Sequence, residues 1–270
     1  QAAIWKMNGC NQLDGSTVGG DPGSNWKVVG SGDFNGDGMA DILWQDTDNG
    51  QVVVWTMNGF NETASTFVGG APGSDWKVVA TGDFAGDGNQ DLVFQNSGGQ
   101  AVVWTMSGTT QTASTFVGGD PGSQWHIVGT GDFNGDGKSD LVWQDSDNGQ
   151  VVVWTMDGTN QTSSTFVGGA PGADWKVVGI GDFAGDGNDD LLFQNTTTGQ
   201  PVLWTMNGAT VQHADLITQL PTGTDCAEAA GFHDGSAEIL LQNSGSTWTL
   251  LQVDGPTILT STSYDARPNL

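Results

Sequence analysis

Hydrophobic residues occur along this chain in short runs that alternate with turns rich in Gly, Asn and Asp. One stretch contains four such runs, at residues 26–30, 41–45, 51–59 and 63–70. The runs are rich in Val, Trp, Phe and Thr, which favour strands, and none has the length or the 3.6-residue period of a helix. Residues 52–55 are continuously apolar rather than alternating, so this strand is expected to be covered on both faces of its sheet.

These four runs recur along the chain with a nearly constant period. The recurring landmark is Asp-x-(Asn/Ala)-Gly-Asp-Gly-x-x-Asp, which begins at Asp33, Asp83, Asp132 and Asp182, at separations of 50, 49 and 50 residues. A period of this length indicates a propeller, a solenoid or another array. Four-stranded antiparallel sheets covered on both faces by like neighbours are the blades of a β-propeller. The predicted fold is therefore an all-β propeller built from such blades.

The repeat also predicts the domain organisation. A unit of this size is too small to close a core alone, so residues 1–270 are expected to form a single β-propeller domain. Its repeats span about 26–75, 76–124, 125–174 and 175–224, a degenerate unit follows at 225–263, and residues 1–20 match only the second half of a unit. Five blades are predicted, with the N-terminal half-unit completing or flanking the last. The alternative is six blades, one of them incomplete or shared between the chains of a homo-oligomer.

The charge of the chain narrows the range of partners. Six Lys and Arg stand against 31 Asp and Glu, which gives a net charge of −25. Phosphate binding needs clustered cations, and an anionic membrane would repel such a surface, so neither nucleic acid nor a membrane is an expected partner. No run of 18 apolar residues is present, so membrane insertion is not expected either.

Two cysteines, Cys10 and Cys226, lie near opposite ends of the chain. A disulfide between them would suit an extracellular protein, and two unrelated buried thiols explain them equally well. The chain starts at Gln1 without Met, as a processed or trimmed form would. We therefore expect a secreted, extracellular protein of bacterial origin.

The Asp-rich loop has the chemistry of a calcium site. In the first unit, places one, three, five and nine offer side-chain oxygens, and place seven offers a main-chain carbonyl. Hard oxygen donors at alternate positions suit Ca²⁺, and the loops lack the His and Cys of zinc sites. An EF-hand is excluded because its Glu at place 12 is replaced by Trp or Phe in all four loops. Plain β-turns are the alternative, since Asp and Gly favour turns anyway.

The stretch from Gly32 to Trp44, Gly-Asp-Phe-Asn-Gly-Asp-Gly-x-x-Asp-Ile-Leu-Trp, resembles the signature of the FG-GAP/VCBS repeat, the β-propeller unit also found in integrin α-chains. The resemblance covers essentially the whole chain. It implies about four calcium ions, each in the hairpin between the first two strands of a blade. The ligands that it implies are Asp33, Asn35, Asp37, Met39 and Asp41; Asp83, Asp87, Asn89 and Asp91; Asp132, Asn134, Asp136, Lys138 and Asp140; and Asp182, Asp186, Asn188 and Asp190.

Two departures limit this transfer. Ala85 and Ala184 replace the Asn at place three, so the calcium sites of units two and four are expected to be weaker or to recruit water. The loop of the fifth unit, between Gly231 and Glu238, is two residues short and is expected to have lost its ion.

The favoured function is a calcium-stabilised binding module for carbohydrate. Equivalent clefts between blades would multiply weak sugar contacts, and the resemblance adds that some FG-GAP-type propellers are lectins. Trp rings can stack on sugars, although packing between blades is the preferred explanation for the Trp residues of the third strand. The polar turns at 45–49, 95–97, 144–148 and 194–196 offer hydrogen-bonding groups; alternatively, their Gln residues tie strands together and touch no ligand.

Two other functions are compatible with this scaffold. One is an adhesion module, cut from a larger surface protein, that binds an extracellular or cell-surface protein, as similar repeats do in adhesins and integrin heads. The other is a polysaccharide-active enzyme. Catalysis needs an unsymmetrical group of residues, and the few irregular ones, His126, His213, His233 and Tyr264, form no recognisable catalytic set. No enzyme is expected, and no catalytic residue is assigned.

Overall fold

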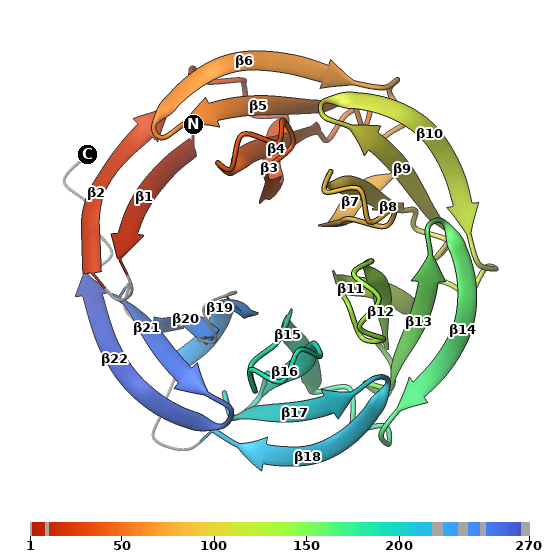
Figure 1. Ribbon diagram of the computed structural model, residues 1–270, viewed down its shortest axis with the longest axis vertical. Helices are drawn as coiled ribbons and strands as arrows, with labels where there is room; N and C mark the ends of the chain where they lie inside the picture. The colour runs from red at the N-terminus through yellow and green to blue at the C-terminus, as the bar shows by residue number, and fades with distance from the viewer. Residues whose placement is uncertain (1, 9–10, 218–223, 232–236, 244–246, 266–270) are drawn as a thin grey trace.

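The computed structural model describes residues 2–8, 11–217, 224–231, 237–243 and 247–265. This part of the chain contains 22 strands and no helix, and hence no helix that could span a membrane. The strands form five four-stranded antiparallel sheets and one two-stranded sheet, arranged in a ring (Figure 1). The prediction of an all-β propeller with five four-stranded blades is confirmed.

Each blade is a run of four consecutive strands that leads from the inside of the ring to its rim (Figure 1). Blade one comprises β3 (Trp26–Gly32), β4 (Asp41–Asp46), β5 (Val52–Asn58) and β6 (Asn61–Val68). Blade two comprises β7 (Lys77–Gly82), β8 (Asp91–Gln95), β9 (Ala101–Ser107) and β10 (Thr110–Val117). Blade three comprises β11 (Trp125–Gly131), β12 (Asp140–Asp145), β13 (Val151–Asp157) and β14 (Asn160–Val167).

The remaining strands complete the ring. Blade four comprises β15 (Trp175–Gly181), β16 (Asp190–Asn195), β17 (Pro201–Asn207) and β18 (Thr210–Leu216). Blade five, from the degenerate unit, comprises β19 (Thr224–Gly231), β20 (Ala237–Asn243), β21 (Thr247–Asp254) and β22 (Thr257–Asp265). The N-terminal sheet comprises β1 (Ala2–Asn8) and β2 (Asn11–Val18).

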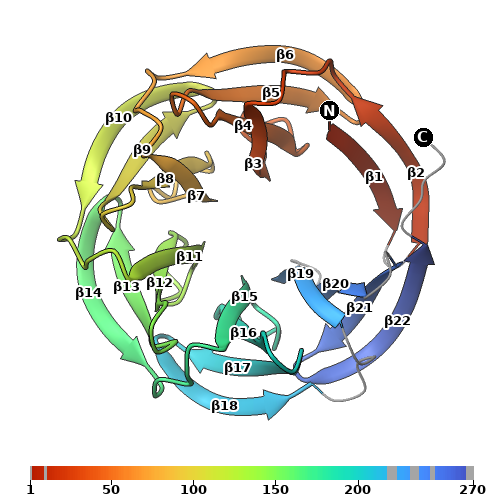
Figure 2. The ribbon, with the colours of Figure 1, turned by 180° about the vertical axis from the view of Figure 1, so that it is seen from behind.

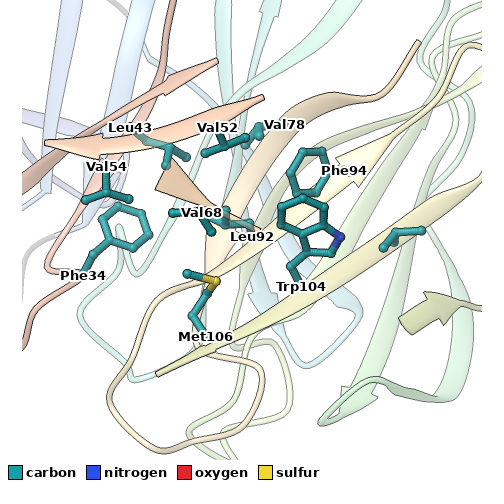
Figure 3. Packing of buried hydrophobic residues seen from close by; sticks show 11 residues of the cluster. Phe34, Leu43, Val52, Val54, Val68, Val78, Leu92, Phe94, Trp104 and Met106 are labelled. Atoms are coloured by element: carbon teal, nitrogen blue, oxygen red, sulfur yellow. The ribbon is translucent and has the colours of Figure 1, made fainter. Parts of the chain in front are cut away.

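The core lies between the faces of neighbouring blades. Blades one and two share one cluster, in which Val54 and Val68 of the first meet Val78 and Trp104 of the second (Figure 3). Six consecutive residues of β5 are buried, as the continuous apolar run predicts. Because Trp104 is only 6% exposed within this cluster, the third-strand Trp packs between blades.

Tight turns bring neighbouring blades together at the rim. Gly50 has φ of 77°, and a Cβ there would lie 2.4 Å from the carbonyl oxygen of Gly73, in the segment that enters the next blade. The N–H of Gly73 donates to the carbonyl of Asn49 at 2.9 Å. Only glycine permits both this backbone conformation and this approach, which explains the glycine at the same place in later units.

The N-terminal half-unit forms a sheet of its own. Among the described residues, β1 pairs only with β2, and this sheet lies in the ring between blades one and five (Figures 1 and 2). Val18 joins the buried cluster of blade one, with Ile42 and Trp44. The half-unit therefore flanks the last blade rather than completing it. Cys10, the side chain of Cys226 and most of the fifth unit's loop lie outside the described residues, so both explanations of the two cysteines and the loss of an ion from this loop stay predictions.

Candidate functional site

The four Asp loops connect the first and second strands of blades one to four. Each loop follows the first strand, such as β3, and ends at a carboxylate that opens the second strand, such as Asp41 in β4. This is the hairpin in which the family resemblance places them.

The first Asp of each loop holds the turn together. Oδ1 of Asp33 accepts the N–H groups of Gly36 at 2.7 Å and Asp37 at 3.2 Å, and Oδ2 accepts that of Gly38 at 2.7 Å. Partial burial acts to raise the pKa of Asp33, but hydrogen bonds from these N–H groups and from that of Asn35 outweigh it, so the pKa is lowered. The carboxylate is therefore ionised at neutral pH. Equivalent bonds to main-chain N–H groups are made by Asp83, Asp132 and Asp182.

The ninth residue of each loop is a buried carboxylate. Asp140 is fully buried; its Oδ2 accepts the N–H of Phe133 at 3.0 Å and its Oδ1 that of Met156, in β13, at 2.8 Å. Burial raises its pKa to about 6. The two hydrogen bonds act to lower the pKa, and the negative charges of Asp132 and Asp136 act to raise it further. Asp41 and Asp91 accept the equivalent N–H groups. Asp190 accepts those of Ala184 and Met206. Burial raises the pKa values of all three, that of Asp190 to about 6.

The Asp at the fifth place of the loop accepts a hydrogen bond from an Asn at a different position in alternate units. In unit one, Asn35 at place three accepts the N–H of Asp37 and donates to its Oδ2, both at 2.9 Å. In unit two, where place three is Ala85, Asn89 at place seven donates its side-chain N–H to Asp87 at 2.9 Å. Units three and four repeat the same two arrangements, with Asn134 and Asn188 respectively. The Ala substitutions are thus matched by an Asn four places later.

Calcium fits these loops by the chemistry of their oxygen donors. In unit one, the charges of Asp37 and Asp33 contribute to the raised pKa of buried Asp41, so the three carboxylates lie within electrostatic reach of one another. Their oxygens, however, accept N–H groups from the protein itself. In the described part of the chain, no three His, Cys, Asp or Glu side chains converge as a metal site.

The Gln residues of the polar turns tie blades together. Gln45 is 2% exposed; its Nε2 donates to the carbonyl of Trp76 at 2.9 Å, and its Oε1 accepts the N–H of Val78 at 3.0 Å, both in the next blade. Gln95 and Gln144 make the same pair of bonds across the next two blade junctions. Of the two sequence-based alternatives, the structure supports the strand tie, so these side chains are not free to hold a ligand.

Aromatic clefts lie on blades two and three. In blade two, the cleft has a volume of about 370 Å³ and is lined by Trp76, Trp104 and Phe116, together with polar Gln111 and Ser114. Phe116, on the outermost strand, is 66% exposed and meets Trp76 edge to face at 6.0 Å between ring centroids. Such a large exposed aromatic ring on a rim strand gains little from the core of the protein.

The cleft recurs in neighbouring units. Phe67 pairs with Trp26 and Phe166 pairs with Trp125, each at 6.3 Å and at nearly the same angle. The cleft of blade three has a volume of about 210 Å³ and includes Trp143, whose buried indole Nε1 has no acceptor among the described residues. In blade four, Leu216 stands where the Phe would be and is 56% exposed. The aromatic pair therefore recurs in blades one, two and three, and blade four lacks it.

The exposed Phe residues are candidate functional residues that the sequence analysis overlooked. Each ends a polar strand in the repeated phrase Ser-Thr-Phe-Val-Gly-Gly. The Val after it is buried, so alternation places the Phe on the opposite, solvent-facing side of the strand. That alternation is the signal that could have identified Phe67, Phe116 and Phe166 before the structure was known.

Comparisons with solved structures find the same fold at low sequence identity. A chain of the nidogen/laminin complex matches with a TM-score of 0.62 and 12% identity, over 96% of this chain and 88% of that one. The Dos1 propeller matches with a TM-score of 0.51 and 11% identity, over 82% of this chain and 55% of that one. A chain of the Tc holotoxin pore of Photorhabdus luminescens matches with a TM-score of 0.56 and 14% identity, over 97% of this chain, which spans only 13% of that one.

No curated protein matches the chain in sequence. A family profile does, and its description is the FG-GAP-like repeat. It matches three overlapping segments, residues 33–94, 83–143 and 132–193, each of which runs from one Asp loop through the next. The segments cover more than half of the chain and run from the Asp loop of blade one to β16 of blade four. The chain belongs to the FG-GAP-like repeat family.

Proposed function

We propose that this protein is a binding module for carbohydrate, stabilised by calcium in its Asp loops. A propeller of FG-GAP-like repeats suits a binding or interaction module, since its repeated blades present similar clefts. The observation that carries the proposal of carbohydrate is the aromatic pair, repeated in three blades, in which a Trp at the start of the blade meets an exposed Phe of the fourth strand; in blades two and three the pair lines a cleft.

The chemistry of the cleft suits a sugar ring. The faces of aromatic rings carry partial negative charge and attract the C–H groups on one side of a pyranose, while nearby polar groups bind its hydroxyls. In blade two, Gln111 and Ser114 lie beside the rings; in blade three, Ser164 does. The clefts are small and open, so a single one would bind weakly. Three copies on one rigid ring would raise the apparent affinity for a polymer or a dense glycan.

The calcium part of the proposal depends on the loops rather than on the clefts. Each of the four loops places three carboxylates within nine residues, and a cation would offset their mutual repulsion. Extracellular calcium is abundant enough to occupy even weak sites, which favours a secreted protein. The cation would act as a structural element of the blade, because none of the loop carboxylates lines a cleft.

A glycan array tests the carbohydrate assignment. We expect the wild-type protein to bind a subset of glycans in the presence of calcium, and the triple variant Phe67→Ala/Phe116→Ala/Phe166→Ala to bind them at least tenfold more weakly. Leu216→Ala is the matched control, because it removes an exposed side chain at the same repeat position without removing an aromatic ring. It should bind as the wild type does.

Two results would contradict the proposal. One is the absence of any glycan binding by the calcium-loaded protein. The other is a triple variant that binds as tightly as the Leu216→Ala control. A defined extracellular protein that binds the wild type without glycan, and does not bind the triple variant, would instead favour the adhesion function.

A further inference from the structure

The clefts of blades two and three lie at equivalent places in the repeat but differ in size. The cleft of blade two (cleft two) has a volume of about 370 Å³, and that of blade three (cleft three) has a volume of about 210 Å³. Most residues that line cleft three have counterparts of the same type in cleft two, at Pro72, Trp76, Val102, Trp104, Ser114 and Phe116. The exception is Trp143, whose counterpart in cleft two is Phe94.

This exceptional position forms the floor of each cleft. Phe94 and Trp143 are both 1% exposed, so they lie beneath the other lining residues. The ring of Phe94 packs on that of Trp104 with centroids 4.4 Å apart at 45° (Figure 3), and Trp143 packs on Trp154 at 4.5 Å and 46°. Because the two arrangements match, the larger indole of Trp143 fills space at the floor of cleft three that the phenyl ring of Phe94 leaves open.

Among blades one to four, only blade two combines the smaller floor residue with the aromatic pair. Blade one has Trp44 at the floor position, as blade three has Trp143. Blade four has Phe193 there, but Leu216 replaces its outer Phe. Ligand pockets generally have volumes of roughly 300–1,000 Å³, so cleft two reaches the lower end of this range and cleft three does not.

We propose, on the basis of the carbohydrate function proposed above, that cleft two is the principal sugar subsite of the ring and that Phe94 is its specificity-determining residue. A sugar between Trp76 and Phe116 reaches the floor of cleft two, whereas Trp143 holds it nearer the mouth of cleft three. Deeper seating removes more apolar area from water, which stabilises the bound sugar. Gln111 also lines cleft two and offers its amide to the hydroxyls. The other aromatic pairs bind more weakly.

NMR titration of the indole N–H groups tests this hierarchy, because Trp76 lies in cleft two and Trp125 in cleft three. The probes are the methyl β-glycosides of glucose, galactose, mannose and N-acetylglucosamine, added one at a time to calcium-loaded protein. We expect at least one glycoside to shift the Trp76 resonance with a dissociation constant about tenfold lower than that at Trp125, since a small difference in the size of an apolar pocket has an effect of this order.

Exchange of the two floor residues tests the role of Phe94. Phe94→Trp should weaken binding at Trp76 to the level at Trp125, and Trp143→Phe should tighten binding at Trp125. The second exchange removes no hydrogen bond, because the buried Nε1 of Trp143 has no acceptor among the described residues. Phe193→Trp is the matched control, since it makes the same substitution in a blade without the aromatic pair, and it should leave both dissociation constants unchanged.

The possible failures are distinguishable. Equal dissociation constants at Trp76 and Trp125 in the wild type, or exchange variants that leave their order unchanged, would overturn the hierarchy and leave the carbohydrate function standing. A wild type that binds glycans on the array while no glycoside shifts the Trp76 resonance would also overturn the hierarchy alone. The absence of glycan binding on the array would overturn both proposals.

Discussion

At the scale of single residues, the ninth place of each Asp loop links three parts of a blade. Asp140 lies at the start of β12, binds the N–H of Phe133 in the preceding loop, and binds the N–H of Met156 in β13. A carboxylate is needed for this because both of its oxygens must accept. The residue therefore stabilises the blade whether or not a cation is bound.

Replacement of Asp140 by Asn tests this role. An amide has one accepting oxygen, so one of the two main-chain N–H groups would face the NH₂ group and lose its partner. A buried unpaired donor, together with a lost bond to a charged group, should lower the free energy of unfolding by roughly 3 kcal/mol. Urea denaturation followed by tryptophan fluorescence measures the change. Asp147→Asn, at an exposed position of the next turn, is the control, and an equal loss in both variants would contradict this assignment.

The same residues predict an unusual pH dependence for the metal-free protein. Burial raises the pKa values of Asp140 and Asp190 to about 6 in the folded state, above the ordinary value of 3.8 that they regain on unfolding. Between these values the folded state binds more protons than the unfolded state, so stability should rise as the pH falls from about 6 to about 4. Below pH 4 it should fall again, because the lowered pKa values of Asp33 and Asp87 have the opposite effect.

Urea midpoints of metal-stripped protein, measured across this range of pH, check the direction. The double variant Asp140→Asn/Asp190→Asn should show a flatter dependence, since two of the groups that titrate are absent. A midpoint of the wild type that falls steadily from pH 6 to pH 4 would contradict the prediction.

The sequence predicts which residues form each loop, but not which of its carboxylates bind main-chain N–H groups of the blade. In the sequence, every Asp of a loop is an equally good candidate ligand, because Asp residues at alternate positions are typical of a cation site. The partners of Asp140 are main-chain N–H groups, one of them 16 residues away, and main-chain groups leave no mark in the sequence. The hydrogen bonds by which Gln side chains join neighbouring blades cannot be predicted for the same reason, since Gln45 binds main-chain groups of Gly50, Trp76 and Val78.

At the scale of elements, the Asp loop has two versions that alternate around the ring. Blades one and three hold the fifth-place Asp with an Asn at place three, and blades two and four hold it with an Asn at place seven. The second version lacks the side-chain oxygen at place three of the loop. We expect it to bind calcium more weakly.

Ala85→Asn should therefore tighten calcium binding in blade two. The new side chain would restore the oxygen that Asn35 and Asn134 provide in blades one and three. A gain of about tenfold in affinity is expected, measured by calorimetric titration of metal-stripped protein. Ala85→Leu is a control of similar size without an oxygen, and a gain in both variants, or in neither, would contradict the ligand assignment.

The strands themselves are largely predictable, because each apolar run is bounded by glycine-containing turns. The continuous run at 52–55 predicts a strand with both faces covered, and the structure confirms this. The rim clefts are less predictable. The outer strands have the polar composition of an ordinary exposed edge, and the pairing of Phe116 with Trp76 joins residues 40 positions apart. Only the packing of four strands brings these two rings together.

At the scale of the whole molecule, the chain carries a charge of −25, and 13 of its 31 acidic residues lie in the four Asp loops. Cations that bind only the folded ring should stabilise it by mass action, by about 2.7 kcal/mol for each site at a hundredfold excess over its dissociation constant. For a chain of this length, two occupied sites correspond to a rise in the thermal midpoint on the order of 10 °C.

Excess EGTA should therefore lower the thermal midpoint of the calcium-loaded protein by this amount. Differential scanning calorimetry with and without the chelator measures the shift, and re-addition of calcium should reverse it. Magnesium at the same concentration controls for simple charge screening. An unchanged melting curve in EGTA would refute calcium binding by the loops.

The number of blades can be predicted from the sequence because each blade is one repeat. The connection of the ring between blade five and blade one cannot be predicted, because it depends on contacts between segments more than 200 residues apart. Residues 1–20 match half a unit, and this alone does not say whether they complete a neighbouring sheet or stand separately. In the structure, they stand separately and pack against Trp44 and its neighbours in blade one.

The outermost strands have a consequence for how this protein behaves in concentrated solution. Strands β6, β10 and β14 each pair on one side only, so their far edges present main-chain donors and acceptors around the circumference. Such edges can recruit strands from other molecules, and these three are rich in Thr and Ser with a single carboxylate among them, Glu62. Mutual repulsion between strongly anionic rings keeps these edges apart, and its range shrinks to about 8 Å at physiological ionic strength. Repulsion between whole rings, rather than charged residues or prolines on the edge strands themselves, therefore keeps the protein dispersed. High concentrations of monovalent or divalent salt should promote fibrous association through these outer strands.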